Sequence, residues 1–345
     1  MNRVRQFTVT ISLALASAGH AEIYELPPAG FDVVGAISTI TARHEDTLVD
    51  IARRHGLGYE DIVRANPDVN GWVPAEGTEV VLPTQFVLPP GERKGVVLNL
   101  AEYRLYYFTE PRDGVPSYVV SYQISLGLMD WETPIGLTTV ISKVTNPTWY
   151  PPQSVRDEHA ADGDPLPRIV PPGPKNPLGK HAMRLGLPGY LIHSTNRPAG
   201  VGMRVTHGCV RMFPEDIEYL FGHIDIDTRV RIINVPIKMG WSGNELVMEA
   251  HPVLETNTPT VDDPAEAPVA VAVEDAVVED VALEVEDIIT RDPLTFVTEQ
   301  FITATGERAG QLDWHLAEEI VGRADGIPVP VGTGLKNAAT SAASE

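Results

Sequence analysis

The sequence predicts a mainly β protein with two modest domains and flanking tails. Its 345 residues exceed the usual size of one compact domain. Thirty prolines and 29 glycines favour turns and short strands over long helices. From residue 95 onward, runs rich in β-branched and aromatic residues recur between turn sequences, as at 96–100, 103–108 and 117–126.

The negative charge of the chain disfavours some classes of partner. The formal net charge is −21, which argues against nucleic acid and against anionic membrane surfaces. Residues 251–290 carry eleven Asp or Glu and no Lys or Arg, which is about half of the excess. Because this stretch is also rich in Ala, Val and Pro, we expect an acidic low-complexity linker there.

Residues 1–21 have the pattern of a secretory signal peptide. Arg3 and Arg5 precede an apolar run over residues 7–18, and small residues follow up to Ala21. The run is too short to span a bilayer stably, so we expect cleavage after about Ala21, a periplasmic protein and no stable membrane insertion. An uncleaved membrane anchor is the alternative.

A small β-α-α-β module is expected over residues 38–84, after an extended, Pro- and Gly-rich leader over 22–37. The strands are expected at 38–43 and 80–83, and the helices after the N-cap candidate Asp46 and over 59–65.

This module resembles a LysM domain, which binds glycans that contain N-acetylglucosamine. The resemblance rests on Asp46-Thr47-Leu48, Ile51-Ala52, Ile62, Asn66-Pro67, Gly77 and Leu82-Pro83. It implies shallow binding of peptidoglycan beside the starts of the helices. A spacer domain without a ligand is the alternative.

The main domain is expected over residues 94–236. Its strands are interrupted by a proline-rich loop at 146–179, which cannot lie in a central sheet and is either a lid over a site or an elaborate connection. A helix is expected over 213–221 and a closing strand over 229–235.

A small C-terminal α+β unit is expected over residues 291–331. Thr295-Phe296-Val297 has the composition of a strand, and residues 311–320 have apolar residues at helical spacing. Residues 332–345 are expected to form a disordered polar tail.

Cys209 is the only cysteine of the chain, and its surroundings point to nucleophilic catalysis. A thiol nucleophile needs a base and donors for the oxyanion that forms when it attacks a carbonyl. His193 and His207 are both candidate bases, and Gly208 permits a sharp turn whose amides could converge on one oxygen. A zinc site of His193, His207 and Cys209, or structural burial of all three, are the alternatives.

The residues around Cys209 resemble the signature of the L,D-transpeptidases of the YkuD fold. The signature comprises Ile192-His193-Ser194-Thr195-Asn196 and Thr206-His207-Gly208-Cys209-Val210-Arg211-Met212. Residues 95–99, 104–107, 133–136, 147–149 and 176–179, together with the LysM-first layout, resemble the ErfK/YbiS/YcfS branch. The implied catalytic fold is a YkuD-type β-sandwich.

The resemblance implies a reaction on peptidoglycan stem peptides. Cys209 would attack the bond between diaminopimelate and the terminal D-alanine of a tetrapeptide, release D-alanine and form a thioester. An amine would then resolve the thioester. The acceptor in this branch is often a lysine of an outer-membrane lipoprotein, and elsewhere another diaminopimelate.

The resemblance also implies a role for each site residue, with no metal and no cofactor. His193 would be the general base, and the main-chain carbonyl of Ser194 would orient its ring. His207 and Gly208 would shape the oxyanion hole and acyl pocket. Arg211 would bind a substrate carboxylate, for which its fork is suited; a surface salt bridge is the alternative.

Thr206 and Asn196 complete the expected substrate-binding residues. Ser194 departs from the family pattern, which usually has glycine after the first histidine, and this puts the fine geometry there in question. Two other functions compete with the transpeptidase. One is a carboxypeptidase that gives the thioester to water, and the other is a wall-binding protein without catalysis.

Overall fold

The computed structural model describes residues 22–127, 133–206, 208–254, 292–306 and 308–335. The expected signal peptide therefore lies outside the described residues, as do most of the expected acidic linker and of the C-terminal tail. No helix in the described part of the chain is long and apolar enough to cross a membrane.

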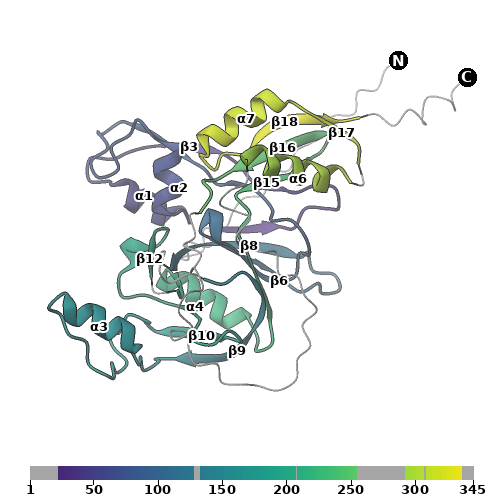
Figure 1. Cartoon of the computed structure of the whole chain (residues 1–345). Helices are drawn as coiled ribbons and strands as arrows, with labels where there is room; N and C mark the ends of the chain where they lie inside the picture. The colour runs from purple at the N-terminus through teal and green to yellow at the C-terminus, as the bar shows by residue number, and fades with distance from the viewer. Residues whose placement is uncertain (1–21, 128–132, 207, 255–291, 307, 336–345) are drawn as a thin grey trace, which may run out of the picture.

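The largest sheet has ten strands in the order β1-β8-β13-β11-β10-β9-β14-β6-β7, with β12 paired to β8. Because β7 also pairs with β8, the sheet closes on itself (Figure 1). The strands are β1 (Glu22–Glu25), β6 (Gly95–Asn99), β7 (Arg104–Phe108), β8 (Tyr118–Gly127), β9 (Gly136–Thr145), β10 (His181–Leu185), β11 (Leu191–His193), β12 (Arg204–Thr206), β13 (Val210–Met212) and β14 (Arg229–Ile233). The mainly β prediction is confirmed.

One apolar core fills the closed sheet, and helix α4 (Pro214–His223) covers part of it. The core includes Ile192 and Met212, which flank the stretch that contains Cys209. Pro214 starts α4 at a position where a missing N–H costs nothing, and Ile217 and Leu220 are buried on its inner face. The short 3-10 turns are η1 (Leu100–Glu102) and η2 (Pro198–Gly200).

The expected β-α-α-β order is present near the N-terminus. It consists of β3 (Ser38–Thr41), α1 (Leu48–Arg54), α2 (Tyr59–Ala65) and β4 (Glu79–Leu82), with β3 antiparallel to β4. The expected cap of α1 is wrong: Thr47, not Asp46, is the N-cap and accepts from the Asp50 amide at 3.1 Å. Asp46 instead accepts from the Arg43 amide and pairs with Arg54 at 2.7 Å.

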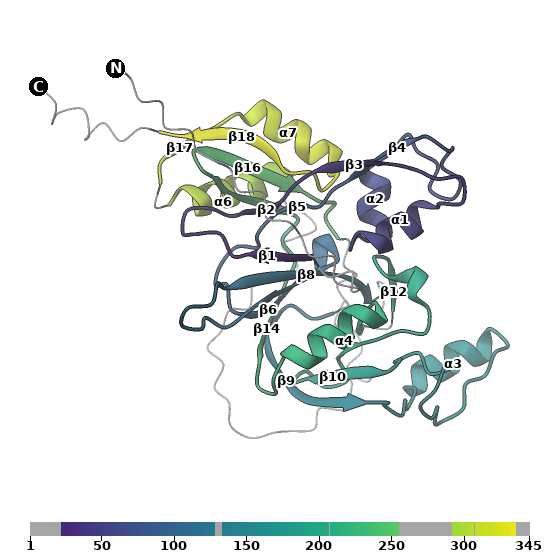
Figure 2. The ribbon, with the colours of Figure 1, turned by 180° about the vertical axis from the view of Figure 1, so that it is seen from behind.

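Residues 22–37 contain two paired strands, which are separated by a turn at residues 29–30. β1 adds to the main sheet beside β8, and β2 (Val33–Gly35) pairs with β5 (Gln85–Val87). The stretch therefore joins the small module to the main sheet, as Figure 2 shows from behind.

A separate four-stranded sheet, in the order β15-β16-β18-β17, forms the C-terminal unit. Its elements are β15 (Ile237–Ser242), β16 (Glu245–Ala250), α6 (Pro293–Thr305), β17 (Gly310–Leu312), α7 (Trp314–Arg323) and β18 (Val329–Gly334). The hairpin β15–β16 follows directly on the main domain, so this sheet combines strands from both sides of the acidic stretch. β18 also extends into residues 332–334, which were expected in the tail.

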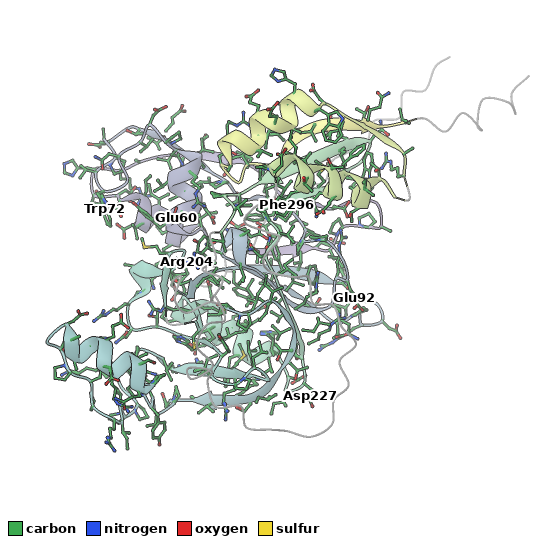
Figure 3. The ribbon with its side chains drawn as sticks, viewed as in Figure 1. Glu60, Trp72, Glu92, Arg204, Asp227 and Phe296 are labelled. Carbon is green, nitrogen blue, oxygen red and sulfur yellow. The ribbon has the colours of Figure 1, made fainter. Side chains whose placement is uncertain are left out.

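The predicted strand at 295–297 is wrong, because these residues lie inside α6. Asp292 caps that helix by accepting from the Leu294 amide, and Pro293 occupies its first position. Phe296 and Val297 are buried in the apolar core that α6 shares with the sheet, and Figure 3 labels Phe296. Tertiary packing has overridden the strand preference of β-branched and aromatic residues.

The second predicted helix of this unit is correct in type and shifted in position. Residues 311 and 312 belong to β17, and Asp313 caps α7 by accepting from the Leu316 amide at 3.1 Å. The helix therefore starts at Trp314 and ends at Arg323.

A buried charged cluster joins the main domain to the C-terminal sheet. The Lys238 ammonium lies 2.6 Å from a carboxylate oxygen of Glu102 and 2.9 Å from one of Glu249, and all three side chains are fully buried. Glu249 also accepts from the Val87 amide at 2.6 Å. The turn η1, strand β5 and the hairpin β15–β16 therefore share one set of hydrogen bonds to buried charged groups.

Candidate active site

The pairing of β11 with β13 brings the two halves of the Cys209 signature together. The strands are parallel, with His193 opposite Arg211 and Ile192 opposite Val210. Cys209 immediately precedes β13, so it lies at the edge of this pair beside Leu191, at the start of β11.

The turn before Cys209 depends on a glycine and on a distant threonine. Gly208 has φ +88°, a left-handed conformation that other residues avoid. Its carbonyl accepts a hydrogen bond of 2.9 Å from the buried Thr133 hydroxyl. The backbone that presents the thiol is therefore fixed from the segment that leads into β9.

His193 is buried and held in one tautomer. Its Nδ1 lies 2.6 Å from the main-chain carbonyl oxygen of Ser194. Because a carbonyl only accepts, Nδ1 must carry the hydrogen and donate it. The ring therefore presents Nε2 as its acceptor, which is the form that a general base requires.

Ser194 is itself fixed on both sides. Its amide donates to the His181 carbonyl at 2.9 Å, and its side chain is buried against Gly179. A Cβ on Gly179 would lie 2.6 Å from the Ser194 Cβ, and the φ of Gly179 is +64°. The Ser194 side chain thus fits only because residue 179 has no Cβ.

The thiol and the imidazole are both neutral at rest. Burial raises the pKa of the Cys209 thiol, although a hydrogen bond with the Leu191 backbone and the charge of Arg211 lower it. Burial, followed by the charge of Arg211, lowers the pKa of His193 to about 4, against the opposing effect of the Ser194 carbonyl. Both shifts disfavour a resting thiolate–imidazolium pair.

His193 and Cys209 line a cavity of about 1030 Å³. The proline-rich segment 146–179 forms much of its wall through Trp149, Tyr150 and the helix α3 (Gln153–Ala161). The segment 146–179 therefore borders the cavity, as the lid alternative requires, and it also connects β9 to β10. A volume of this size lies at the upper end of the range for small-molecule sites.

The cavity is cationic although the chain is acidic. Arg184, Arg197, Arg211 and Lys175 line it, and Asp164 is the one carboxylate among the described lining residues. Burial and the neighbouring charge of Arg197 lower the pKa of Arg211. Two guanidinium groups that act on each other in a partly buried site provide a place for an anion.

Comparison with known proteins identifies the chain. The L,D-transpeptidase catalytic domain, YkuD, matches residues 93–232. The probable L,D-transpeptidase YcfS of Escherichia coli is 38% identical over 271 residues, which is 77% of this chain and 83% of YcfS. The chain belongs to the YkuD family of L,D-transpeptidases.

Two further relatives extend the match. The probable L,D-transpeptidase ErfK/SrfK of Escherichia coli is 39% identical over 68% of this chain and 76% of its own length. The ErfK/SrfK protein of Salmonella typhimurium is 32% identical over 97% of this chain and 99% of its own. The predicted family and branch are confirmed.

The structure of this L,D-transpeptidase gathers most of the expected site residues. Cys209, His193, Arg211 and Asn196 line the cavity, and Ser194 and Gly208 are buried beside it. The Asn196 amide donates to the Pro174 carbonyl at 3.2 Å. Thr206 is in β12, where it pairs with Gly127 through the backbone, and His207 lies outside the described residues.

Sequence reasoning missed several residues of the site. Thr133 was noted only as part of a family motif. No sequence pattern assigned a site role to Arg184, Arg197 or Lys175. Each lies in a different stretch of sequence, so the pairing of β9, β10 and β13 was needed to bring them to Cys209. A count of cations between 175 and 211 could have found the three basic residues.

A cluster with metal-binding composition lies away from this cavity. Ligand atoms of Glu102, Glu249 and His251 lie within 4.8 Å of one another. The Lys238 ammonium is already within 2.9 Å of both carboxylates. It takes the place that a cation would occupy, so this cluster fits a structural role.

Proposed function

We propose that the protein is a cysteine-dependent transpeptidase of periplasmic peptidoglycan. The observation that carries the proposal is the hydrogen bond of His193 Nδ1 to the Ser194 carbonyl, which leaves Nε2 as the basic nitrogen, in a cavity that is also lined by Cys209. The cationic lining supports a substrate with several carboxylates, as in a stem tetrapeptide that ends in diaminopimelate and D-alanine.

The first half of the reaction is acylation. His193 Nε2 takes the thiol proton as Cys209 Sγ attacks the carbonyl between diaminopimelate and D-alanine. We expect His207 and Gly208 to form the oxyanion hole, with backbone amides as the donors. His193 returns its proton to the leaving amine, D-alanine departs and a thioester remains on Cys209.

The second half is transfer. An amine, from a lipoprotein lysine or a second diaminopimelate, attacks the thioester and gives a proton to His193, which passes it to the leaving thiol. Arg211, with Asn196 and Thr206, would hold the carboxylates and the peptide in position. The β-α-α-β module would bind the glycan as a LysM domain, and the first 21 residues would direct export.

The test is incubation of the purified protein with peptidoglycan sacculi, with and without a peptide that ends in the C-terminal lysine of a lipoprotein. We expect tetrapeptides to lose D-alanine and to gain a linked amine, as measured by mass spectrometry of the muropeptides. Cys209→Ala and His193→Gln should each abolish product. Full activity of Cys209→Ala would exclude the proposal, and tripeptides alone would assign the carboxypeptidase activity instead.

A further inference from the structure

A second hollow, of about 330 Å³, lies between the β-α-α-β module and the main domain. Residues of α1 and Tyr59 of α2 form one side, and η2, Val201 and Phe213 form the other. Both views show α1 and α2 beside β12, and Glu60 and Arg204 mark the two sides of this junction in Figure 3. Neither part of the chain encloses the hollow alone.

The walls of this hollow are held in a fixed relation. Arg53 of α1 pairs with Glu215 of α4 at 2.9 Å, and the buried Arg104 of β7 pairs with Asp61 of α2 at 2.6 Å. Gly202 and Gly58 approach so closely that a Cβ on Gly202 would lie 2.5 Å from the Gly58 Cα. The hollow is therefore present before any ligand arrives, which lowers the cost of binding.

The chemistry of the hollow suits a sugar. Its apolar and aromatic side chains that are not buried, such as Val49, Tyr59 and Ala199, can cover the C–H faces of a pyranose and an acetamido methyl group. Asp50 and Arg197 on its two sides can accept from and donate to hydroxyl groups. Two arginines accompany the one acid of the hollow, whereas four basic residues accompany the one acid of the cavity around Cys209.

Arg197 connects the two cavities, because it lines both. They are thus separated by about one arginine side chain. A stem peptide reaches from its sugar to the bond attacked by Cys209 through three residues, or roughly 10 Å when extended. A sugar whose peptide enters the cavity therefore has to lie in its immediate neighbourhood.

We propose that the hollow between α1 and η2 binds the amino-sugar unit that carries the stem peptide. The inference rests on the proposed function for the identity of the peptide. The module and the main domain would then bind one substrate jointly, with the sugar in the hollow and its peptide directed past Arg197 to Cys209.

The first test measures sugar binding without catalysis. The full chain with Cys209→Ala is titrated by NMR with the N-acetylglucosamine–N-acetylmuramic acid disaccharide that lacks a peptide. Val49→Trp and Ala199→Trp fill the hollow from opposite walls, and each should weaken binding at least fivefold. Ala309→Trp, at an exposed position of the C-terminal unit, is the matched control and should leave binding unchanged.

Absence of binding, or equal binding by the two hollow-filling variants and the control, would overturn the inference. Unchanged thermal melting would show that the variants are folded, and either variant alone suffices for the comparison.

The second test separates this inference from the proposed function. With Cys209 intact, kcat/KM is measured for a disaccharide-tetrapeptide and for the free tetrapeptide. We expect a preference of at least tenfold for the disaccharide donor, and we expect Ala199→Trp to reduce that preference at least fivefold. Equal use of the two donors by the parent protein contradicts the inference. A failure of both donors contradicts the proposed function, and the titration still decides the sugar site.

Discussion

Single neighbouring residues determine the protonation state and the tautomer of the proposed catalytic pair, His193 and Cys209. The Ser194 carbonyl fixes the tautomer of His193. Burial and the charge of Arg211 lower the pKa of His193 to about 4, so the imidazole is neutral above that pH. Burial also keeps the Cys209 thiol protonated. In the proposed reaction, proton transfer would accompany attack on the substrate, and the oxyanion donors would offset the cost of separating the charges in the transition state.

The depressed pKa of His193 predicts activity in acid. A general base must be unprotonated, so activity should fall only as the pH drops through about 4, the folded pKa of His193. We expect the acid limb of kcat/KM against pH to be centred near 4. A limb centred near the ordinary histidine value would contradict the assignment of the base. Thermal melting at each pH controls for unfolding.

Gly179 and Ser194 predict a rescue experiment. Gly179→Ala places a methyl group 2.6 Å from the Ser194 Cβ and forces alanine into a left-handed conformation, which costs about 1–2 kcal/mol. The displaced Ser194 carbonyl should misorient His193 and lower kcat/KM about tenfold or more.

Ser194→Gly in the same chain removes the clash with the Ser194 side chain, and it leaves both the backbone strain and the 2.9 Å approach to the Thr195 backbone nitrogen. The double variant should therefore recover part of the lost activity while its stability stays low. No recovery of activity would mean that the contact between 179 and 194 does not position His193.

At the scale of elements, the site depends on connections that join strands far apart in sequence. The hydrogen bond from Thr133 fixes the carbonyl before Cys209, and segment 146–179 lines the cavity from the connection between β9 and β10. These segments border the thiol because β9, β10, β11 and β13 are neighbours in the sheet.

Removal of the Thr133 hydroxyl should loosen the turn that carries Cys209. Thr133→Val keeps the shape and deletes the donor, so the buried Gly208 carbonyl loses its partner. We expect kcat to fall about tenfold and the free energy of unfolding to fall by about 1–2 kcal/mol. Thr133→Ser keeps the hydroxyl and should retain most of both. Equal behaviour of the two variants would show that the hydrogen bond is dispensable.

The elements also show which features local sequence can predict. The strands of the main sheet, the β-α-α-β order and the placement of Cys209, His193 and Ser194 follow from short motifs and periodicity. The strand predicted at 295–297 failed, because Asp292 and Pro293 start a helix and its apolar side chains pack on a sheet. Arg197 and Thr133 could not be assigned to the site, since only the strand order brings them there.

At the scale of the molecule, the cluster of Lys238, Glu102 and Glu249 binds the catalytic domain to the C-terminal sheet. Burial alone would raise the pKa of Glu249, but Lys238 and His251 hold it below its usual range. The Glu249 carboxylate is therefore charged, and the Lys238 ammonium beside it stabilises this charged form. The sequence predicts a separate C-terminal unit, whereas the buried ion pairs of Lys238 connect its sheet to the catalytic domain.

Lys238→Met should destabilise the whole chain. It leaves two buried carboxylates without their ammonium, which typically costs about 3–5 kcal/mol and is a large fraction of the stability of a native protein. Urea denaturation followed by fluorescence measures this loss. The exposed pair Arg323–Glu319 supplies the control, because Glu319→Gln should change stability by less than about 1 kcal/mol. A midpoint for Lys238→Met equal to that of the control would refute the role of the cluster.

The single thiol of the chain has a practical meaning for work on the enzyme. Any reagent that modifies sulfhydryl groups reacts with Cys209 alone. The mass of the intact protein after labelling therefore gives the fraction of molecules with an intact Cys209 thiol. Oxidation in storage would appear as the loss of that one reactive group, and a covalent inhibitor would saturate at one equivalent. Titration of the active sites therefore needs neither a substrate nor a tag.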